Sequence, residues 1–196
     1  ICTIDLICLS ILLKKNNNNM YNELLTIENE IVTISSDDLD SSYHIGNWAI
    51  PPSYYEFSKE LGYGLLLELF LTYIPMGKGN PFCDSLENQN IYLKNILKKY
   101  LETPLMMLKN ADNYNLIANA EPFMFSENGE IVFWDIREPK NGEYPIYLAN
   151  FPVGVYYVGG NFKEFIVNLT DKDKYKKILT FHQEPLLPKF KPLKLR

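Results

Sequence analysis

Residues that bind metals or form disulfides are scarce in this sequence of 196 residues, which contains three cysteines and two histidines. Cys2 and Cys8 lie within the first nineteen residues, so Cys83 is the single cysteine in the rest of the chain. One thiol cannot form a disulfide within a domain, which excludes a disulfide-stapled scaffold and fits a reducing, cytoplasmic location. His44 and His182 are far apart, and neither a His-x-x-x-His nor a Cys-x-x-Cys pair occurs. Because zinc sites use several such ligands, we predict no metal site and no other cofactor.

Arginine is also scarce, with two in the chain, and the formal net charge is −5. A nucleic-acid-binding protein needs a basic face, so we expect no nucleic-acid partner. The charge is unevenly distributed: residues 1–19 carry +1 and residues 185–196 carry +4, which leaves −10 on residues 20–184. An acidic body suits a basic partner, since complementary fields speed encounter. The alternative is that this charge only keeps the protein in solution.

Long hydrophobic runs are absent as well. The apolar stretch over residues 1–13 is shorter than the roughly 20 residues that a spanning helix needs, so we expect no membrane span. Its positive residues, Lys14 and Lys15, follow the apolar stretch, whereas a secretory signal has them before it. We interpret residues 1–19 as a leader translated upstream of a natural start at Met20. A membrane anchor of unusual form is the alternative.

Motifs for nucleotide binding and nucleophilic catalysis are missing too. Neither Gly-x-x-x-x-Gly-Lys-Ser/Thr nor Gly-x-Ser-x-Gly occurs in the sequence. Acidic residues do gather around one expected hairpin, at Glu127, Glu130, Asp135, Glu138 and Glu143. Two carboxylates flanking a cleft can hydrolyse glycosidic bonds, so a hydrolase that uses Asp135 and Glu143 is an alternative. The more economical role of these acids is turn formation and solvation, and we predict that the protein is not an enzyme.

The hydrophobic periodicity predicts one α+β domain over residues 20–184. A helix should begin at Ser53, with Glu56 completing a capping box, and end at Gly62 in a left-handed conformation. Tyr54, Phe57 and Leu61 then share a buried face. Further helices are expected over residues 90–101, 162–169 and 172–181, and strands within residues 65–74, 114–118, 122–125, 130–137, 144–149 and 153–158. Residues 21–34 begin like a helix and end in β-branched residues, which leaves their type open.

This order of elements indicates a largely antiparallel sheet with helices packed on one face. Asn128-Gly129 should supply the positive φ of a tight hairpin, and residues 139–142 should form the next turn. The basic, proline-containing tail over residues 185–196 should be extended and lie along the domain surface, because proline blocks helices and central strands. A lipid-binding role for this tail is the alternative.

Aromatic residues are abundant, with 14 tyrosines, 11 phenylalanines and two tryptophans. Most must belong to the core. Tyrosines such as Tyr54, Tyr55, Tyr144 and Tyr147 can bury a ring while the hydroxyl stays in water. Tyrosine-rich, acid-flanked surfaces are typical of protein recognition.

Three segments resemble the SUKH superfamily, which includes a yeast regulator of cell-wall synthesis and many bacterial immunity proteins. The first is Ile50-Pro-Pro-Ser-Tyr-Tyr-Glu-Phe-Ser-Lys-Glu-Leu-Gly62, which is similar to the opening helix of the family. The second is Ala120-Glu-Pro-Phe-Met-Phe-Ser-Glu-Asn-Gly-Glu-Ile-Val-Phe-Trp-Asp135, which is similar to its central strands. The third joins Tyr144-Pro-Ile-Tyr-Leu148 to Tyr156-Tyr-Val-Gly-Gly-Asn-Phe-Lys-Glu-Phe165, which is similar to its closing hairpin and helix.

The residues that carry this resemblance are mostly core and turn residues: Pro51, Tyr54, Phe57, Gly62, Gly129, Trp134, Asp135, Phe162 and Phe165. The resemblance implies an α+β fold without enzymatic activity and a role in binding a protein. In bacteria that partner is typically a toxin, here one with a basic, nuclease-like domain; in eukaryotes the contact is regulatory or scaffolding. We place the candidate partner-binding residues on the acidic hairpin, at Asp135, Arg137, Glu138, Glu143 and Tyr144.

Overall fold

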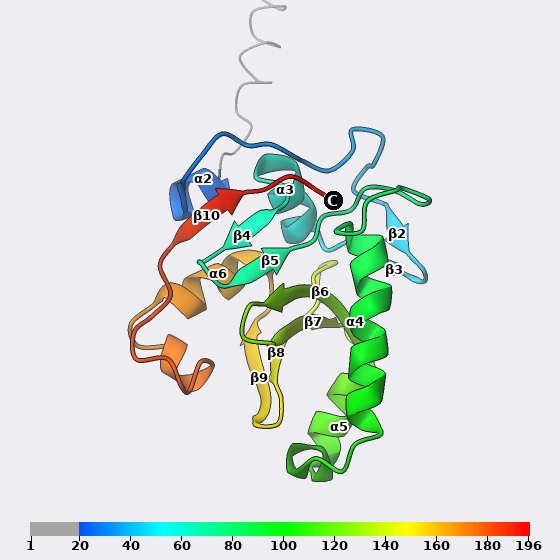
Figure 1. The fold of residues 1–196 in the computed structure, drawn as a ribbon, viewed down its shortest axis with the longest axis vertical. Coiled ribbons are helices and arrows are strands. Elements are labelled where there is room, and N and C mark those ends of the chain that lie inside the picture. Colours follow the sequence, from blue (N-terminus) through cyan, green and yellow to red (C-terminus); the bar gives the residue numbers. More distant parts are fainter. Residues whose placement is uncertain (1–19) are drawn as a thin grey trace, which may run out of the picture.

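The computed structural model describes residues 20–196, so the residues that we interpret as a leader lie outside it. The predicted α+β class, single domain and largely antiparallel sheet are confirmed (Figure 1). One sheet has eight strands in the order β1-β10-β4-β5-β6-β7-β8-β9, and all neighbours are antiparallel except β1 and β10. A separate hairpin is formed by β2 and β3.

The strands are β1 (Thr26–Ile27), β2 (His44–Ile45), β3 (Trp48–Ala49), β4 (Gly64–Leu66), β5 (Phe70–Thr72), β6 (Ala120–Ser126), β7 (Ile131–Asp135), β8 (Ile146–Asn150), β9 (Gly154–Gly159) and β10 (Lys189–Pro192). The helices are α2 (Met20–Leu24), α3 (Pro52–Glu60), α4 (Leu86–Leu101), α5 (Ala111–Ala118) and α6 (Phe162–Thr170), with 3-10 turns η1 (Met106–Lys109) and η2 (Tyr175–Lys177). Among residues 20–196, no helix is long and apolar enough to cross a membrane.

Five rings pack together where α3 and α6 meet the sheet. Phe123 and Trp134 stack with centroids 3.7 Å apart, and Tyr54 lies edge-on to Trp134 at 5.1 Å and to Phe162 at 4.8 Å. Phe57 completes this aromatic cluster, 4.7 Å from Phe162. All five side chains are at most 1% exposed. Burying each ring contributes about 1.5–3 kcal/mol, so the cluster is a main source of stability.

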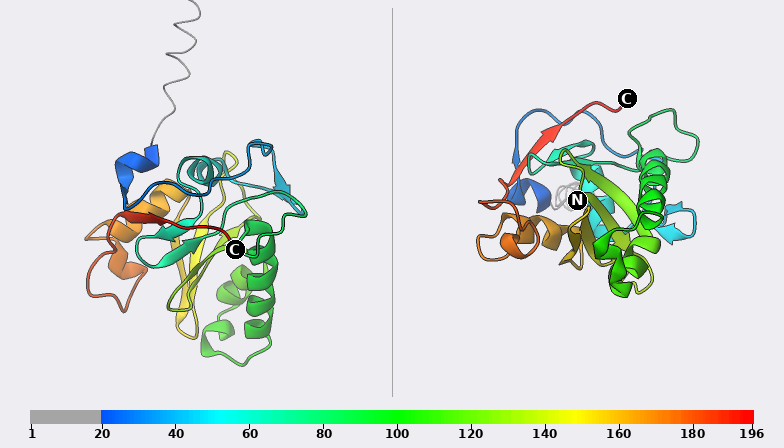
Figure 2. Two further views of the ribbon diagram at one scale, coloured as in Figure 1. Left: turned by 45° about the horizontal axis from the view of Figure 1, so that its top comes forward. Right: turned by 60° about the horizontal axis from the view of Figure 1, so that its bottom comes forward.

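We had expected all the helices to pack on one face of the sheet, but helices cover both faces. All five residues of β7 are buried, which requires cover on both sides of the strand. The side that carries Trp134 is covered by rings of α3 and α6. In Figure 2, α6 and α4 lie on opposite sides of β6 and β7. The long helix α4 therefore supplies cover that periodicity alone could not assign to a face.

Helix α3 has the predicted buried face but a different beginning. Tyr54, Phe57 and Leu61 are fully buried, and Gly62 has φ +76°, as predicted. The predicted capping box is wrong, because Pro51 is the N-cap and no side chain caps the helix from that position. Ser53 lies inside the first turn instead, and a distant carboxylate binds it.

Other elements differ from the predictions in extent or type. Helix α4 begins at Leu86 with Ser85 as its cap, four residues before the predicted start. Residues 114–118 belong to helix α5 rather than to a strand, because Asn110 caps a helix there by accepting the N–H groups of Asp112 and Asn113. The helix predicted over residues 172–181 is reduced to the short turn η2.

The predicted hairpins are confirmed, as is α6. Gly129 has φ +96° between β6 and β7, while Asn141 and Gly142 both have positive φ in the next turn. Asn161 caps α6 by accepting the N–H of Glu164 at 2.9 Å. The basic tail differs from expectation, because it forms β10 inside the sheet, between β1 and β4, with Phe190 fully buried. Three residues of β10 pair with β4, including Pro192 opposite Gly64.

Residues 28–40 form a long connection that we call the strap, which crosses one end of the molecule from β1 toward β2 (Figure 1). Its Thr33 carbonyl accepts the N–H of Tyr63 at 2.9 Å, and Ser35 donates its N–H to Ser58 at 3.1 Å. A Cβ on Gly62 would lie 1.7 Å from the Thr33 oxygen. Glycine is therefore required at this position both for its positive φ and for the close approach of the strap.

We expect Gly62→Ala to lower the free energy of unfolding by about 3 kcal/mol or more, because it adds a left-handed alanine and a backbone clash. Urea denaturation measures the change. Gly46→Ala is the matched control: Gly46 has φ +63° but nothing within 4 Å of a new Cβ, so it should cost only about 1 kcal/mol. Equal losses in the two variants would contradict the role assigned to the strap contact.

Candidate functional site

The first predicted partner-binding residues lie at the end of β7. Arg137 donates two hydrogen bonds to Asp135, from Nε to Oδ1 and from Nη2 to Oδ2, both at 2.7 Å. These bonds hold the pKa of Asp135 below its usual range, although partial burial opposes the shift. The Asp135 side chain is 12% exposed and that of Arg137 is 41% exposed. The pair therefore presents the guanidinium, and not the carboxylate, to a partner.

Glu143 has a structural role. Its Oε1 accepts the N–H of Ser53 and its Oε2 accepts the Ser53 hydroxyl, both at 2.7 Å. The hydroxyl oxygen of Ser53 in turn accepts the N–H of Phe162 at 2.9 Å. Burial raises the pKa of Glu143, while the Ser53 bonds lower it. This chain of bonds fastens the turn before β8 to the first turns of α3 and α6.

The predicted residues do not form one site. Tyr144 is 8% exposed and belongs to the core, whereas Glu138 is exposed. Arg137 lines one surface hollow, and Glu143 lines a different one together with Glu164. Asp135 and Glu143 are each engaged by a neighbour, so the structure does not present them as the free pair that a glycosidase uses.

The residues that carry the SUKH resemblance are structural in this protein. Five of them are aromatic and buried: Tyr54, Phe57, Trp134, Phe162 and Phe165. Pro51 begins α3, and both glycines supply positive φ in turns. Asp135 alone joins this group to the surface, through Arg137.

A larger hollow of about 570 Å³ lies between the β2–β3 hairpin and α4. We call it the α4 groove. Its walls are residues 43–48 on one side and Glu87, Asn88, Ile91 and Asn95 of α4 on the other. A second hollow of about 430 Å³ shares Asn47, Lys94 and Glu121 with it and extends to Arg137. The two hollows adjoin at these three residues, and the second includes one predicted residue, Arg137.

A buried carboxylate forms part of the groove lining. Glu121 is paired with Lys94 at 2.7 Å and accepts a hydrogen bond from Asn90 Nδ2 at 3.1 Å. Its side chain is 7% exposed, whereas that of Lys94 is 47% exposed. A buried charge without such partners would be strongly destabilising, so Lys94 and Asn90 are needed to keep Glu121 there. The Asn90 amide also donates to the Pro122 carbonyl at 2.9 Å, which ties α4 to β6.

A second carboxylate, Glu87, joins the walls of the groove. It accepts the Tyr43 hydroxyl at 2.9 Å and the Gly77 N–H at 2.8 Å. Burial and this carboxylate raise the pKa of Tyr43 well above its ordinary value. Trp48 holds the β2–β3 hairpin against the core, because its ring lies 5.4 Å from that of Trp134 in the aromatic cluster.

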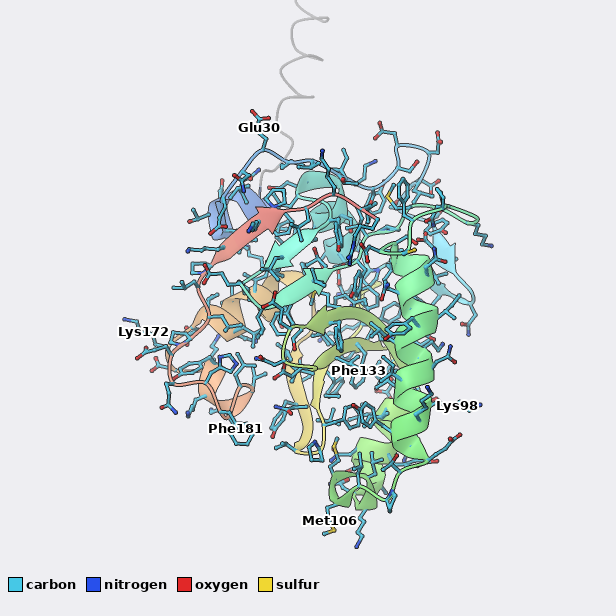
Figure 3. All side chains as sticks on the ribbon, in the orientation of Figure 1. Glu30, Lys98, Met106, Phe133, Lys172 and Phe181 are labelled. Atoms are coloured by element: carbon cyan, nitrogen blue, oxygen red, sulfur yellow. The ribbon has the colours of Figure 1, made fainter. Side chains whose placement is uncertain are left out.

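Two large apolar side chains are exposed on α4, and one of them, Ile91, lies at the groove (Figure 3 shows this helix with its side chains). Ile91 lines the groove and is 62% exposed, and its neighbour Tyr92 is 58% exposed. The buried residues of α4 are Leu86, Asn90, Leu93 and Leu97, at spacings typical of one helical face. Ile91 falls outside that face. A helix predicted to start at Leu86 would have placed Ile91 outside the buried face. Our sequence analysis did not identify the groove.

Among residues 20–196, no group of three or more His, Cys, Asp or Glu side chains is placed to hold a metal ion. No protein-family model, curated protein or solved structure matches this chain.

We expect Arg137→Met to raise the pKa of Asp135 toward its ordinary value of about 3.9. A carboxylate whose pKa is lowered by folding stabilises the protein above its unfolded pKa and loses that contribution as the pH falls through the folded pKa. The variant should therefore be less stable at neutral pH and show a smaller loss of stability on acidification. Carboxyl ¹³C NMR titration measures the pKa. Lys140→Met removes a nearby exposed cation and should leave it unchanged; an unchanged pKa in Arg137→Met would contradict the assignment.

We expect Glu143→Ala to destabilise the protein by about 1–3 kcal/mol, because Ser53 loses both of its carboxylate bonds. Chemical denaturation provides the measurement. Glu138→Ala changes an exposed acid of the same turn and should stay within about 0.5 kcal/mol of the wild type. If the two variants behave alike, Glu143 does not fasten the turn to α3.

Proposed function

We propose that this protein is a non-catalytic protein-binding module of SUKH type and that its α4 groove contacts the partner. The observation that carries the proposal is the exposed apolar side chain of Ile91, which lines a hollow of about 570 Å³. Large apolar side chains on a surface mark interaction sites when they adjoin a depression with a polar rim. The rim here is rich in amides, including Asn47, Asn88 and Asn95.

The groove is suited to binding because its walls are fixed before a partner arrives. Glu87 ties the hairpin side to the loop at Gly77, and Asn90 ties α4 to β6. Preorganised walls lower the entropic cost of association. Aromatic and aliphatic anchors on such a frame are the usual energetic centres of protein interfaces.

We further propose that the module is cytoplasmic and that an immunity role, in which it neutralises a basic toxin, is its most specific form. The support is the resemblance of the three segments together with the charge of −10 over residues 20–184. A regulatory scaffold that binds proteins of its own cell uses the same surfaces. The gene beside this one would distinguish them, since a toxin gene there favours immunity.

The test is affinity capture from the source cell, followed by measurement of binding with the purified partner. We expect Ile91→Asp to weaken that binding by about 30-fold, which corresponds to about 2 kcal/mol for an anchor in the centre of an interface. A charge at a buried apolar contact would remain without a partner.

Tyr114→Asp is the matched control, because Tyr114 is an exposed aromatic residue on the neighbouring helix α5, 44% exposed. It should bind as the wild type does. A partner that binds Ile91→Asp and wild type equally would refute the groove as the contact, and turnover of a substrate by the purified protein would refute the non-catalytic role.

A further inference from the structure

The strap, residues 28–40, contains a strand-forming sequence that belongs to no strand. Residues 31–34 read Ile-Val-Thr-Ile, and β-branched residues of this kind are strongly enriched in sheets. The regular pairing of β1 ends at Ile27, and the strap continues without a strand or helix until β2. A conflict between local preference and observed structure is most often found at a functional site.

Within residues 20–196, the main chain of residues 29–32 has no hydrogen-bonding partner. Glu28 donates its N–H to Phe190 at 2.9 Å, and the next main-chain bond is that of the Thr33 carbonyl. Between them, residues 29–32 form no hydrogen bond with any other residue among those described. Such N–H and C=O groups are available to a further strand, as at the edge of any sheet.

The side chains of the segment are exposed. Ile31 is 42% exposed, Val32 is 47% exposed and Ile34 is 39% exposed. Three branched aliphatic side chains within four residues of a strand-forming segment are a predicted site of pairing with another chain. Lysine or proline commonly protects an exposed strand edge from pairing, and the sequence has neither between Glu28 and Asp40.

Acidic residues border these side chains on both sides. Glu28 and Glu30 precede them, and Asp37, Asp38 and Asp40 follow. Figure 3 shows Glu30 at the outer edge of the molecule, directed away from it. Two lysines reach this region: Lys59 pairs with Asp37 at 3.0 Å, and Lys189 lies 3.5 Å from Glu28 and is shared with Glu68. Five acids against two lysines leave the strap negative.

We infer that the strap is a docking edge for a basic, extended segment of a partner protein, which adds to it as a strand. The chain's own tail shows that β1, the strand directly before the strap, accepts such a segment on its other side. The tail carries Lys189 and Lys191, and it lies beside β1 through the bond from Thr26 N–H to the Pro188 carbonyl at 2.8 Å. Strand addition takes affinity from main-chain bonds and specificity from alternate side chains, here aliphatic on the face of Ile31 and lysine on the opposite face, toward Glu30.

This inference rests on the proposed protein-binding function and names a second contact surface for it, separate from the α4 groove. The test is hydrogen exchange on the full chain with two probes, an alternating Lys-Val octapeptide and its Glu-Val counterpart. In the free protein, the amides of residues 29–32 should exchange at nearly unstructured rates, because nothing among the described residues protects them. Millimolar Lys-Val probe should slow their exchange by about tenfold or more, and added salt should reverse the effect.

Ile31→Lys should abolish this protection, because it places a charge of the same sign as the probe and removes an apolar contact. Val153→Lys is the matched control and should keep the protection, because Val153 is a branched aliphatic residue of similar exposure, 43%, outside both proposed surfaces. Both positions are exposed, and thermal denaturation checks that each variant is folded. Four results would each overturn the inference: protection of residues 29–32 in the free chain, equal effects of the two probes, no protection with either probe, and normal protection in Ile31→Lys. If the natural partner still requires Ile91 in any of these cases, the proposed function stands and only the strap is excluded.

Discussion

The packing of Tyr54 against four other rings is the interaction on which the rest of this structure depends. Its ring contacts Phe57, Phe123, Trp134 and Phe162, which come from α3, β6, β7 and α6. Its hydroxyl donates to the Tyr73 carbonyl at 2.7 Å, so the polar atom of Tyr54 is satisfied. Burial raises the pKa of Tyr54 well above its ordinary value, so the hydroxyl keeps its proton and remains a donor at neutral pH. Ring packing aligns the elements, and the adjacent Ser53, bound to Glu143 and Phe162, fixes the start of α3 relative to the turn before β8 and to α6.

Both proposed contact surfaces are positioned by that cluster from opposite ends of α3. Before the helix, Trp48 packs on Trp134 and thereby holds the hairpin that forms one wall of the α4 groove. After the helix, Gly62 lets the Thr33 carbonyl approach, and Ser58 accepts the Ser35 N–H, which together hold the far half of the strap. The near half, residues 29–32, receives no such support. The rigid core therefore determines which parts of the surface are preorganised and which are left available for pairing.

The elements that were predicted correctly are those in which one short stretch of sequence contains the whole signal. Tyr54, Phe57 and Leu61 are spaced as a helical face, and β7 is apolar on both sides, so neither needed information from elsewhere. Ser53 was misinterpreted because its partner is Glu143, 90 positions away, and the nearby Glu56 offered a plausible local substitute. The tail was assigned to the surface because of its prolines, yet β10 is a paired strand within the sheet and includes Pro192. The α4 groove could not be predicted at all, since it combines Trp48, Lys94 and Glu121 from separate segments.

The two surfaces differ in how many of their carboxylates are paired, and this difference gives them separate roles in the proposed recognition. In the groove, Glu121 is neutralised by Lys94, and Glu87 is occupied by Tyr43 and main-chain N–H groups, so neither carboxylate is free to attract a partner from a distance. What the groove offers is apolar contact at Ile91, which acts at short range and governs how slowly a complex dissociates. The strap offers long-range electrostatic attraction instead, because its acids lie at the surface and outnumber the lysines that reach them. Such charges raise the rate of encounter with a basic partner and contribute less to the lifetime of the complex. In the proposed recognition, the strap would therefore speed encounter with the partner and the groove would slow its release.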